Sequence, residues 1–114
     1  MSQHSHGTLF YGFVIELSDE EQIDDFRMSD STNLILSKYD CDSLTITCGY
    51  ETFGVGIYHK ELKFCTDDGV VSFSKSTLDS KVAMSMINSL KMCMKELDTI
   101  GAEVPCWHLV EEYF

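Results

Sequence analysis

Basic residues are scarce in this sequence: eight lysines and arginines stand against nineteen aspartates and glutamates, for a formal net charge of −11. Nucleic acids and anionic membranes are bound through basic patches, so this balance argues against direct contact with either. A charged protein partner should instead present a basic surface. Solubility alone is the competing explanation, because net charge acts on solubility before it acts on function.

Long hydrophobic runs are also missing. No apolar stretch approaches the roughly 18 residues of a membrane span, and the first residues lack a basic region followed by an apolar one. We therefore expect a protein that is neither secreted nor embedded in a membrane. The five cysteines form an odd set without close pairs, and four lie in segments with a core-facing pattern. This usage is typical of buried free thiols in the cytoplasm.

Catalytic and cofactor signatures are absent. The sequence contains no Walker loop, dinucleotide-binding fingerprint, zinc-protease helix, nucleophile elbow or C-x-x-C pair. Gly54-Val55-Gly56 looks like part of a phosphate loop, but it lies within a strand-like alternation, which favours close packing of a neighbouring element. Cys106 and His108 would share one face of a strand at about 7 Å, too far apart for the thiol to be activated. We expect no enzyme, no cofactor and no metal site.

The composition that remains is that of a folded domain. Hydrophobic residues make up 44% of the chain and charged residues 24%, near the averages for globular proteins. A chain of this length buries roughly two-thirds of the surface that its unfolded form exposes. Because no linker, repeat or low-complexity tract interrupts it, we predict a single α+β domain over residues 8–114 behind a flexible N-terminus at residues 1–7.

Hydrophobic alternation predicts an antiparallel sheet of about five to six strands. Residues 8–17 carry apolar side chains on both parities, as a central strand covered on both faces would. Residues 43–74 alternate between turn signals and predict a meander. Residues 34–36 fit a short strand or a buried turn. Residues 104–114 fit a last strand, or a short helix that begins at Pro105.

A short acidic helix is predicted over about 19–28. Ser18 followed by Glu21 has the form of a capping box, and negative charge suits the amino end of a helix. The surrounding segment holds one base, Arg27, and seven acidic residues: Glu16, Asp19, Glu20, Glu21, Asp24, Asp25 and Asp30. A concentrated acidic face steers association with basic surfaces and competes with nucleic acid for proteins that bind it. A helix face that contacts only water is the alternative.

A long helix is predicted over about 77–100, with Gly101 at the position of a left-handed C-terminal cap. Its apolar stripe should pack on the sheet and complete a two-layer α+β fold. Met84 and Met92 fall off this stripe. Methionine suits adaptable contacts, so this flank is a candidate second contact for a partner or for another copy of the chain in a homodimer.

Two classes of function follow. The first is a small, non-enzymatic protein-binding module that inhibits a basic, nucleic-acid-handling protein; small acidic domains of this kind are typical of accessory proteins from viruses and mobile elements. The second is a homo-oligomer that binds or sequesters a nucleotide-like small molecule. Its ligand would stack on aromatic side chains, for which the candidates are Tyr11, Tyr50, Tyr58 and Trp107.

Overall fold

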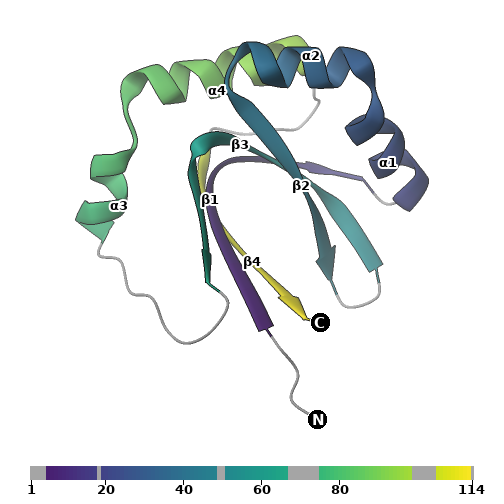
Figure 1. The fold of residues 1–114 in the computed structure, drawn as a ribbon, viewed down its shortest axis with the longest axis horizontal. Coiled ribbons are helices and arrows are strands. Elements are labelled where there is room, and N and C mark those ends of the chain that lie inside the picture. The colour runs from purple at the N-terminus through teal and green to yellow at the C-terminus, as the bar shows by residue number, and fades with distance from the viewer. Residues whose placement is uncertain (1–4, 18, 49–50, 67–74, 99–104, 114) are drawn as a thin grey trace.

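The chain forms one antiparallel sheet with helices packed against it. The structure is a computed structural model that describes residues 5–17, 19–48, 51–66, 75–98 and 105–113. Within these residues the elements follow the order β1, α1, α2, β2, β3, α3, α4, β4, and the strands are arranged β2-β3-β1-β4 across the sheet (Figure 1). The predicted α+β class is confirmed.

β1 (Ser5–Glu16) and β3 (Glu51–Thr66) are the two central strands. Their pairing shifts register in the middle, where Phe10 lies opposite Lys63 but Gly12 lies opposite Tyr58. Extra residues on one strand of a pair bend it. Figure 1 shows both strands bending there, so that the sheet is arched. The central position predicted for residues 8–17 is confirmed, although the strand begins earlier, at Ser5.

The two edge strands are β2 (Cys41–Cys48), beside β3, and β4 (Cys106–Tyr113), beside β1. The described residues therefore contain four strands, and the five to six predicted are not found among them. The first antiparallel pair of the predicted meander is confirmed as β2 and β3, but the alternation from residue 53 to residue 64 belongs to one long, bent strand. The strand expected near residues 70–74 lies outside the described residues. Residues 104–114, for which the sequence allows strand or helix, contribute a strand.

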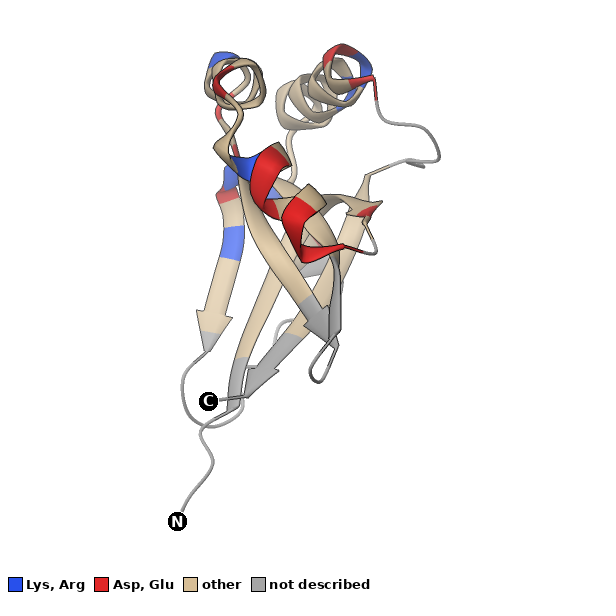
Figure 2. Cartoon of the chain, turned by 90° about the vertical axis from the view of Figure 1, so that its right-hand side faces the viewer, with Lys and Arg blue, Asp and Glu red and all other residues tan. Residues whose placement is uncertain are grey.

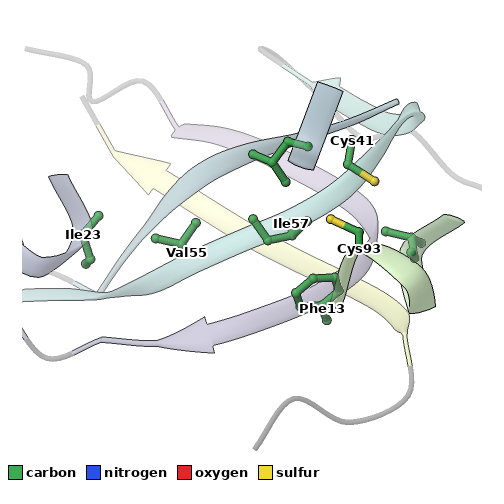
Figure 3. Packing of buried hydrophobic residues seen from close by; sticks show 8 residues of the cluster. Phe13, Ile23, Cys41, Val55, Ile57 and Cys93 are labelled. Carbon is green, nitrogen blue, oxygen red and sulfur yellow. The ribbon is translucent and has the colours of Figure 1, made fainter. Parts of the chain in front are cut away.

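The helices all lie along the outer side of the arch (Figure 1). Their bounds are α1 (Glu20–Met28), α2 (Asp30–Lys38), α3 (Lys75–Lys81) and α4 (Met84–Leu97). The main hydrophobic core fills the space between sheet and helices (Figure 3). It consists of Phe13, Ile23, Leu36, Cys41, Val55, Ile57, Leu90 and Cys93. A second, smaller cluster on the inner side of the arch joins Phe10, Tyr58 and Val110.

The continuous helix predicted over 77–100 is wrong. α3 ends at Lys81, α4 begins at Met84, and Ala83 between them has extended backbone. A straight helix over that range would be about 36 Å long, and an arched sheet offers no straight surface of that length. The break lets each helix follow its own part of the arch: Lys81 Nζ lies 5.5 Å from the Phe64 ring, while α4 reaches the main core.

The end of this helix also differs from the prediction. α4 stops at Leu97, and Asp98 takes the left-handed C-cap conformation, with φ of 52°, that the sequence places at Gly101. Aspartate is one of the few residues other than glycine that adopts this conformation readily. Gly101 itself lies outside the described residues.

α2 is the element that hydrophobic alternation does not reveal. Residues 34–36, interpreted as a short strand or a buried turn, are helical, with Leu36 buried and Leu34 exposed. The helix begins behind Ser29, whose Oγ accepts a hydrogen bond from the Thr32 backbone N–H at 3.4 Å. Ser29 is thus a regular N-cap. This capping signal was available in the sequence. Three consecutive apolar residues, in contrast, fit neither the period of a helix nor that of a strand.

Candidate protein-binding surface

The seven acidic residues selected from the sequence are all exposed in the structure. They lie on α1 and on the chain at its two ends: Glu16, Asp19, Glu20, Glu21, Asp24, Asp25 and Asp30. Figure 2 shows α1, with its red acidic stretches, on the side of the molecule turned to the viewer. The predicted acidic segment is therefore one contiguous feature of the surface.

Helical spacing explains why α1 presents its carboxylates to solvent. Ile23 is 1% exposed and belongs to the main core, and Phe26, three residues later, packs against the same core. Glu21, Asp24 and Asp25 are spaced three and four residues apart on the opposite side. The N-cap is Asp19, whose Oδ1 accepts a hydrogen bond from the Glu21 backbone N–H at 3.0 Å, and not Ser18, which lies outside the described residues.

Arg27, the only base in the acidic segment, does not neutralise it. Its guanidinium group points to β2, where Nε donates to Ser43 Oγ at 3.2 Å, Nη2 to Ser43 O at 3.3 Å and Nη1 to Thr45 Oγ1 at 2.6 Å. Arg27 follows Ile23 by four residues, so it shares the inward side of α1. Between described residues, none of the seven carboxylates forms an ion pair with a base.

Two large apolar side chains adjoin these carboxylates. Met28 is 80% exposed and Leu34 is 73% exposed. Met28 follows Asp24 by four residues on α1, and Leu34 follows Asp30 by four residues on α2, so each lies beside an acidic residue on its helix. We call the seven acidic residues together with Met28 and Leu34 the acidic corner. Sequence reasoning missed both apolar members, although the i,i+4 spacing of Met28 from Asp24 was a usable signal.

The turn between the two helices is held by side-chain hydrogen bonds. Asn33 Nδ2 donates to the backbone oxygens of Arg27 and Ser29, at 3.0 Å each. A second tie joins α2 to α4, where Lys38 Nζ lies 3.0 Å from Glu96 Oε1. This hydrogen bond lowers the pKa of Glu96. The acidic corner is thus built on two short helices that are joined by a hydrogen-bonded turn.

The methionines predicted as a second contact lie on a different surface. Met84 is 69% exposed and Met92 is 48% exposed, both on α4. Lys81, Lys91 and Lys95 on α3 and α4 are exposed as well. The acidic corner and this basic, methionine-bearing flank belong to different helices, so the structure does not bring the two predicted contacts together. The resulting molecule is electrically lopsided.

The aromatic residues proposed to stack on a ligand are engaged in packing. Tyr11 and Trp107 contact each other edge to face, with ring centroids 5.3 Å apart. Tyr58 is only 5% exposed, lies on the inner side of the arch beside Phe10, and has its pKa raised by burial. Tyr50 lies outside the described residues. The described three do not converge on one site.

Cys106 and His108 are much closer than the spacing of a regular strand suggests. Cys106 Sγ lies 3.4 Å from His108 Nε2, so the expected separation of about 7 Å is wrong. The same Nε2 lies 3.2 Å from the Gly12 carbonyl oxygen, which only an N–H can satisfy. Nε2 therefore carries a proton and has no lone pair for the thiol. Burial lowers the pKa of His108, and the pair lacks the arrangement of a nucleophile with its base.

The glycines of the phosphate-loop-like stretch serve close packing, as the sequence indicates. A Cβ on Gly56 would lie 2.7 Å from the Phe10 ring, and one on Gly54 would lie 2.3 Å from the Ile15 carbonyl oxygen of β1. Both positions face β1, and neither lies at the start of a helix. No anion-binding loop is formed there.

The four cysteines whose side chains the structure describes divide into two groups. Cys41 and Cys93 are buried in the main core, where Figure 3 shows both sulfurs, and contact with the Cys93 thiol together with burial raises the pKa of Cys41. Cys65 and Cys106 are exposed, which corrects the expectation that they face the core. All four are free thiols. No three His, Cys, Asp or Glu side chains gather in a metal-binding arrangement in the part of the chain that the structure describes.

No helix within the described ranges has both the length and the apolar character needed to cross a bilayer. No protein-family model matches the chain, and neither a curated protein nor a solved structure shows significant similarity to it. Its function is therefore inferred from the acidic corner and the rest of its own surface.

Proposed function

We propose that the protein is a small, non-enzymatic binding module that engages the basic surface of a protein partner through the acidic corner. The single observation that carries this proposal is that seven exposed carboxylates lie together while the only base among them, Arg27, is turned away into β2. Carboxylates that form no ion pair with a described base are available to a basic partner.

The exposed apolar residues support the same function. Specific interfaces combine an apolar centre with a polar rim, and their strongest contacts are large side chains that become fully buried. Met28 and Leu34 supply such side chains next to the carboxylates. The acidic residues orient the partner and speed its association, whereas Met28 and Leu34 provide apolar surface that is buried on binding. A surface that served solubility alone would not require exposed side chains as apolar as Met28 and Leu34.

The class of partner follows from charge. Proteins that handle nucleic acid carry clustered lysine and arginine, because binding requires neutralisation of the phosphates. A protein that covers such a surface with carboxylates inhibits it by competition. We therefore propose an inhibitor of a nucleic-acid-handling protein, an accessory protein of the kind that viruses and mobile elements carry, acting in the cytoplasm, where free thiols persist.

Charge reversal tests this proposal. Asp24→Lys combined with Asp25→Lys should weaken partner capture roughly tenfold or more, because both positions are exposed and the fold does not depend on them. The measurement is affinity capture from the native cells at low and at raised salt, with quantitative mass spectrometry. Capture of a basic protein that falls with salt is expected, since screening weakens exposed charge pairs.

A matched control separates the effect of charge within the acidic corner from the effect of the protein's net charge. Glu61→Lys makes the same charge change as Asp25→Lys, at an exposed position on β3 outside the acidic corner. The two single variants should differ: Asp25→Lys weakens capture and Glu61→Lys leaves it within about twofold. Equal losses for both, or full capture by the Asp24→Lys/Asp25→Lys protein, would overturn the proposal.

The alternative function, a homo-oligomer that sequesters a nucleotide-like ligand, has less support. Its stacking residues are already in contact with protein, and Tyr58 is almost fully buried. A thermal-shift screen with nucleotides is the direct test of this alternative. A shift of several degrees with one compound would favour it over the inhibitor.

A further inference from the structure

β4 is an edge strand whose outer side is unpaired in the part of the chain that the structure describes. Its eight residues, Cys106–Tyr113, pair with β1 along their whole length, from Cys106 opposite Gly12 to Tyr113 opposite Ser5. Alternate backbone N–H and C=O groups of an edge strand point away from its neighbour. About half of the backbone N–H and C=O groups of β4 therefore point outward, along all eight residues of the strand.

Arg27 covers part of the other edge of the sheet, whereas among the described residues only β1 pairs with β4. On β2, the Arg27 guanidinium donates to the Ser43 carbonyl oxygen and to the Ser43 and Thr45 hydroxyl groups, so α1 is bonded to that edge strand. Proteins usually protect edges in this way, or with lysine, proline or bulges. β4 contains no lysine or proline and no bulge in its pairing with β1, and at its middle it carries Leu109, which is 71% exposed.

Charge distribution favours a second copy of the chain as the occupant of this edge. Two copies together carry twice the net charge of −11, so an interface near the acidic corner would be repulsive. In the order β2-β3-β1-β4, however, α1 is attached to β2 through Arg27, at the edge opposite β4. Pairing through β4 leaves α1 of each copy, with four of the seven acidic residues, near the opposite edges of the joined sheet.

We propose that two copies of the chain pair antiparallel through β4 about a two-fold axis, which gives a continuous eight-stranded sheet. Centred on Leu109, the axis places each Leu109 directly opposite its copy, so the exposed side chain at the middle of each edge covers the other. In this register position 111 lies opposite position 107, and the acidic positions of the two strands do not face each other. The interface is isologous, as in most homodimers.

Cysteine cross-linking tests the register directly. Residues opposite each other in an antiparallel pair have Cβ atoms about 4.5–5.5 Å apart, close to the range that a disulfide spans. In a Cys48→Ser/Cys65→Ser/Cys106→Ser background, in which only the buried Cys41 and Cys93 remain, Leu109→Cys should give a covalent dimer on mild oxidation. Met28→Cys, in the same background and 80% exposed, is the matched control and should stay monomeric on a non-reducing gel.

Sedimentation equilibrium of the unmodified protein gives the second readout. The expected mass is twice 12.9 kDa at about 100 µM. Leu109→Lys should raise the dimer dissociation constant at least about tenfold, because like charges directly opposite are unfavourable. Its side chain is exposed, so its circular dichroism and melting curve should remain those of a folded domain.

Three results would overturn the proposal. One is a monomer at about 100 µM, the second is a dimer that Leu109→Lys leaves unchanged, and the third is no more cross-linking at position 109 than at position 28. The proposal does not rest on the basic partner. Loss of dimerisation in Leu109→Lys with partner capture retained, or the reverse in Asp24→Lys/Asp25→Lys, tells the two surfaces apart.

Discussion

At the scale of single residues, the arch of the sheet depends on two glycines, because a larger side chain at either position would collide with the neighbouring strand. Gly12 and Gly56 both lie where β1 and β3 approach each other closely. A Cβ at Gly12 would lie 1.8 Å from the Ile57 carbonyl oxygen, which is backbone, whereas one at Gly56 would meet the edge of the Phe10 ring. Backbone cannot give way, but a ring can be replaced, so the two sites behave differently on substitution.

Gly56→Ala should therefore destabilise the fold in a way that depends on Phe10. We expect a loss of about 1–3 kcal/mol, because the added methyl group overlaps a ring that is fully buried. In a Phe10→Leu background the same substitution should cost less, since the ring edge is gone. Urea denaturation of the four proteins in this double-mutant cycle measures the coupling.

Gly12→Ala is the matched control for that cycle. Its obstacle is the Ile57 carbonyl, so Phe10→Leu should give it no relief. If Gly56→Ala costs the same with and without the Phe10 ring, the assignment of Gly56 to the space beneath that ring is wrong.

At the scale of elements, α1 is attached to the sheet by Arg27 as well as by its apolar side. The guanidinium makes three hydrogen bonds to Ser43 and Thr45, and Ser43 is buried. Removing the donors leaves these acceptors on β2 without their partner, a loss that mutational series put at about 1–3 kcal/mol. The acidic corner therefore depends on the one basic residue of its segment.

Arg27→Met should lower the free energy of unfolding by about 1–3 kcal/mol while keeping the apolar stem of the side chain. Arg27→Lys keeps the charge but lacks the planar fork, so it should restore only part of the loss. Urea unfolding followed by circular dichroism is the measurement. Lys91→Met, an equal charge change on exposed α4, should stay within about 0.5 kcal/mol. If Arg27→Met matches Lys91→Met, the hydrogen bonds to β2 contribute little.

The helices also show which parts of the fold are readable from sequence. α1 was predictable because Ile23 and Phe26 mark its inner side and acidic residues mark its start. α2 was missed because its apolar residues are consecutive, although Ser29 is a regular N-cap. The division between α3 and α4 was not readable, because Val82 and Ala83 contain no local stop signal; it follows from the arch of the sheet. Local patterns predict elements, and tertiary shape decides their ends.

At the scale of the whole molecule, the acidic residues of the candidate site were predicted from the sequence, but its apolar residues Met28 and Leu34 were not. The seven carboxylates followed from counting residues in one segment, and the structure leaves all of them exposed. The direction of Arg27 and the exposure of Leu34 depend on how α1 and α2 sit on the sheet, and no local pattern encodes that. The 3.4 Å contact of Cys106 Sγ with His108 Nε2 depends on side-chain conformations that a strand pattern does not encode.

Neutralising part of the acidic corner should raise stability and lower binding at the same time. Glu20 with Asp24 and Glu21 with Asp25 are like charges four residues apart, and each such pair costs about 0.2–0.5 kcal/mol. Asp24→Asn combined with Asp25→Asn should therefore stabilise the protein by up to about 1 kcal/mol at low salt, with a smaller gain at high salt. Urea unfolding at two salt concentrations measures the first effect, and partner capture measures the second.

The pair of effects distinguishes a binding surface from a solvated one. A helix face that only contacts water would gain stability on neutralisation without any loss of partner capture. A binding surface retains the repulsion because the same charges are satisfied by the partner, in the way that functional sites generally cost stability. A more stable Asp24→Asn/Asp25→Asn protein with undiminished capture would therefore identify the acidic corner as a means of staying soluble.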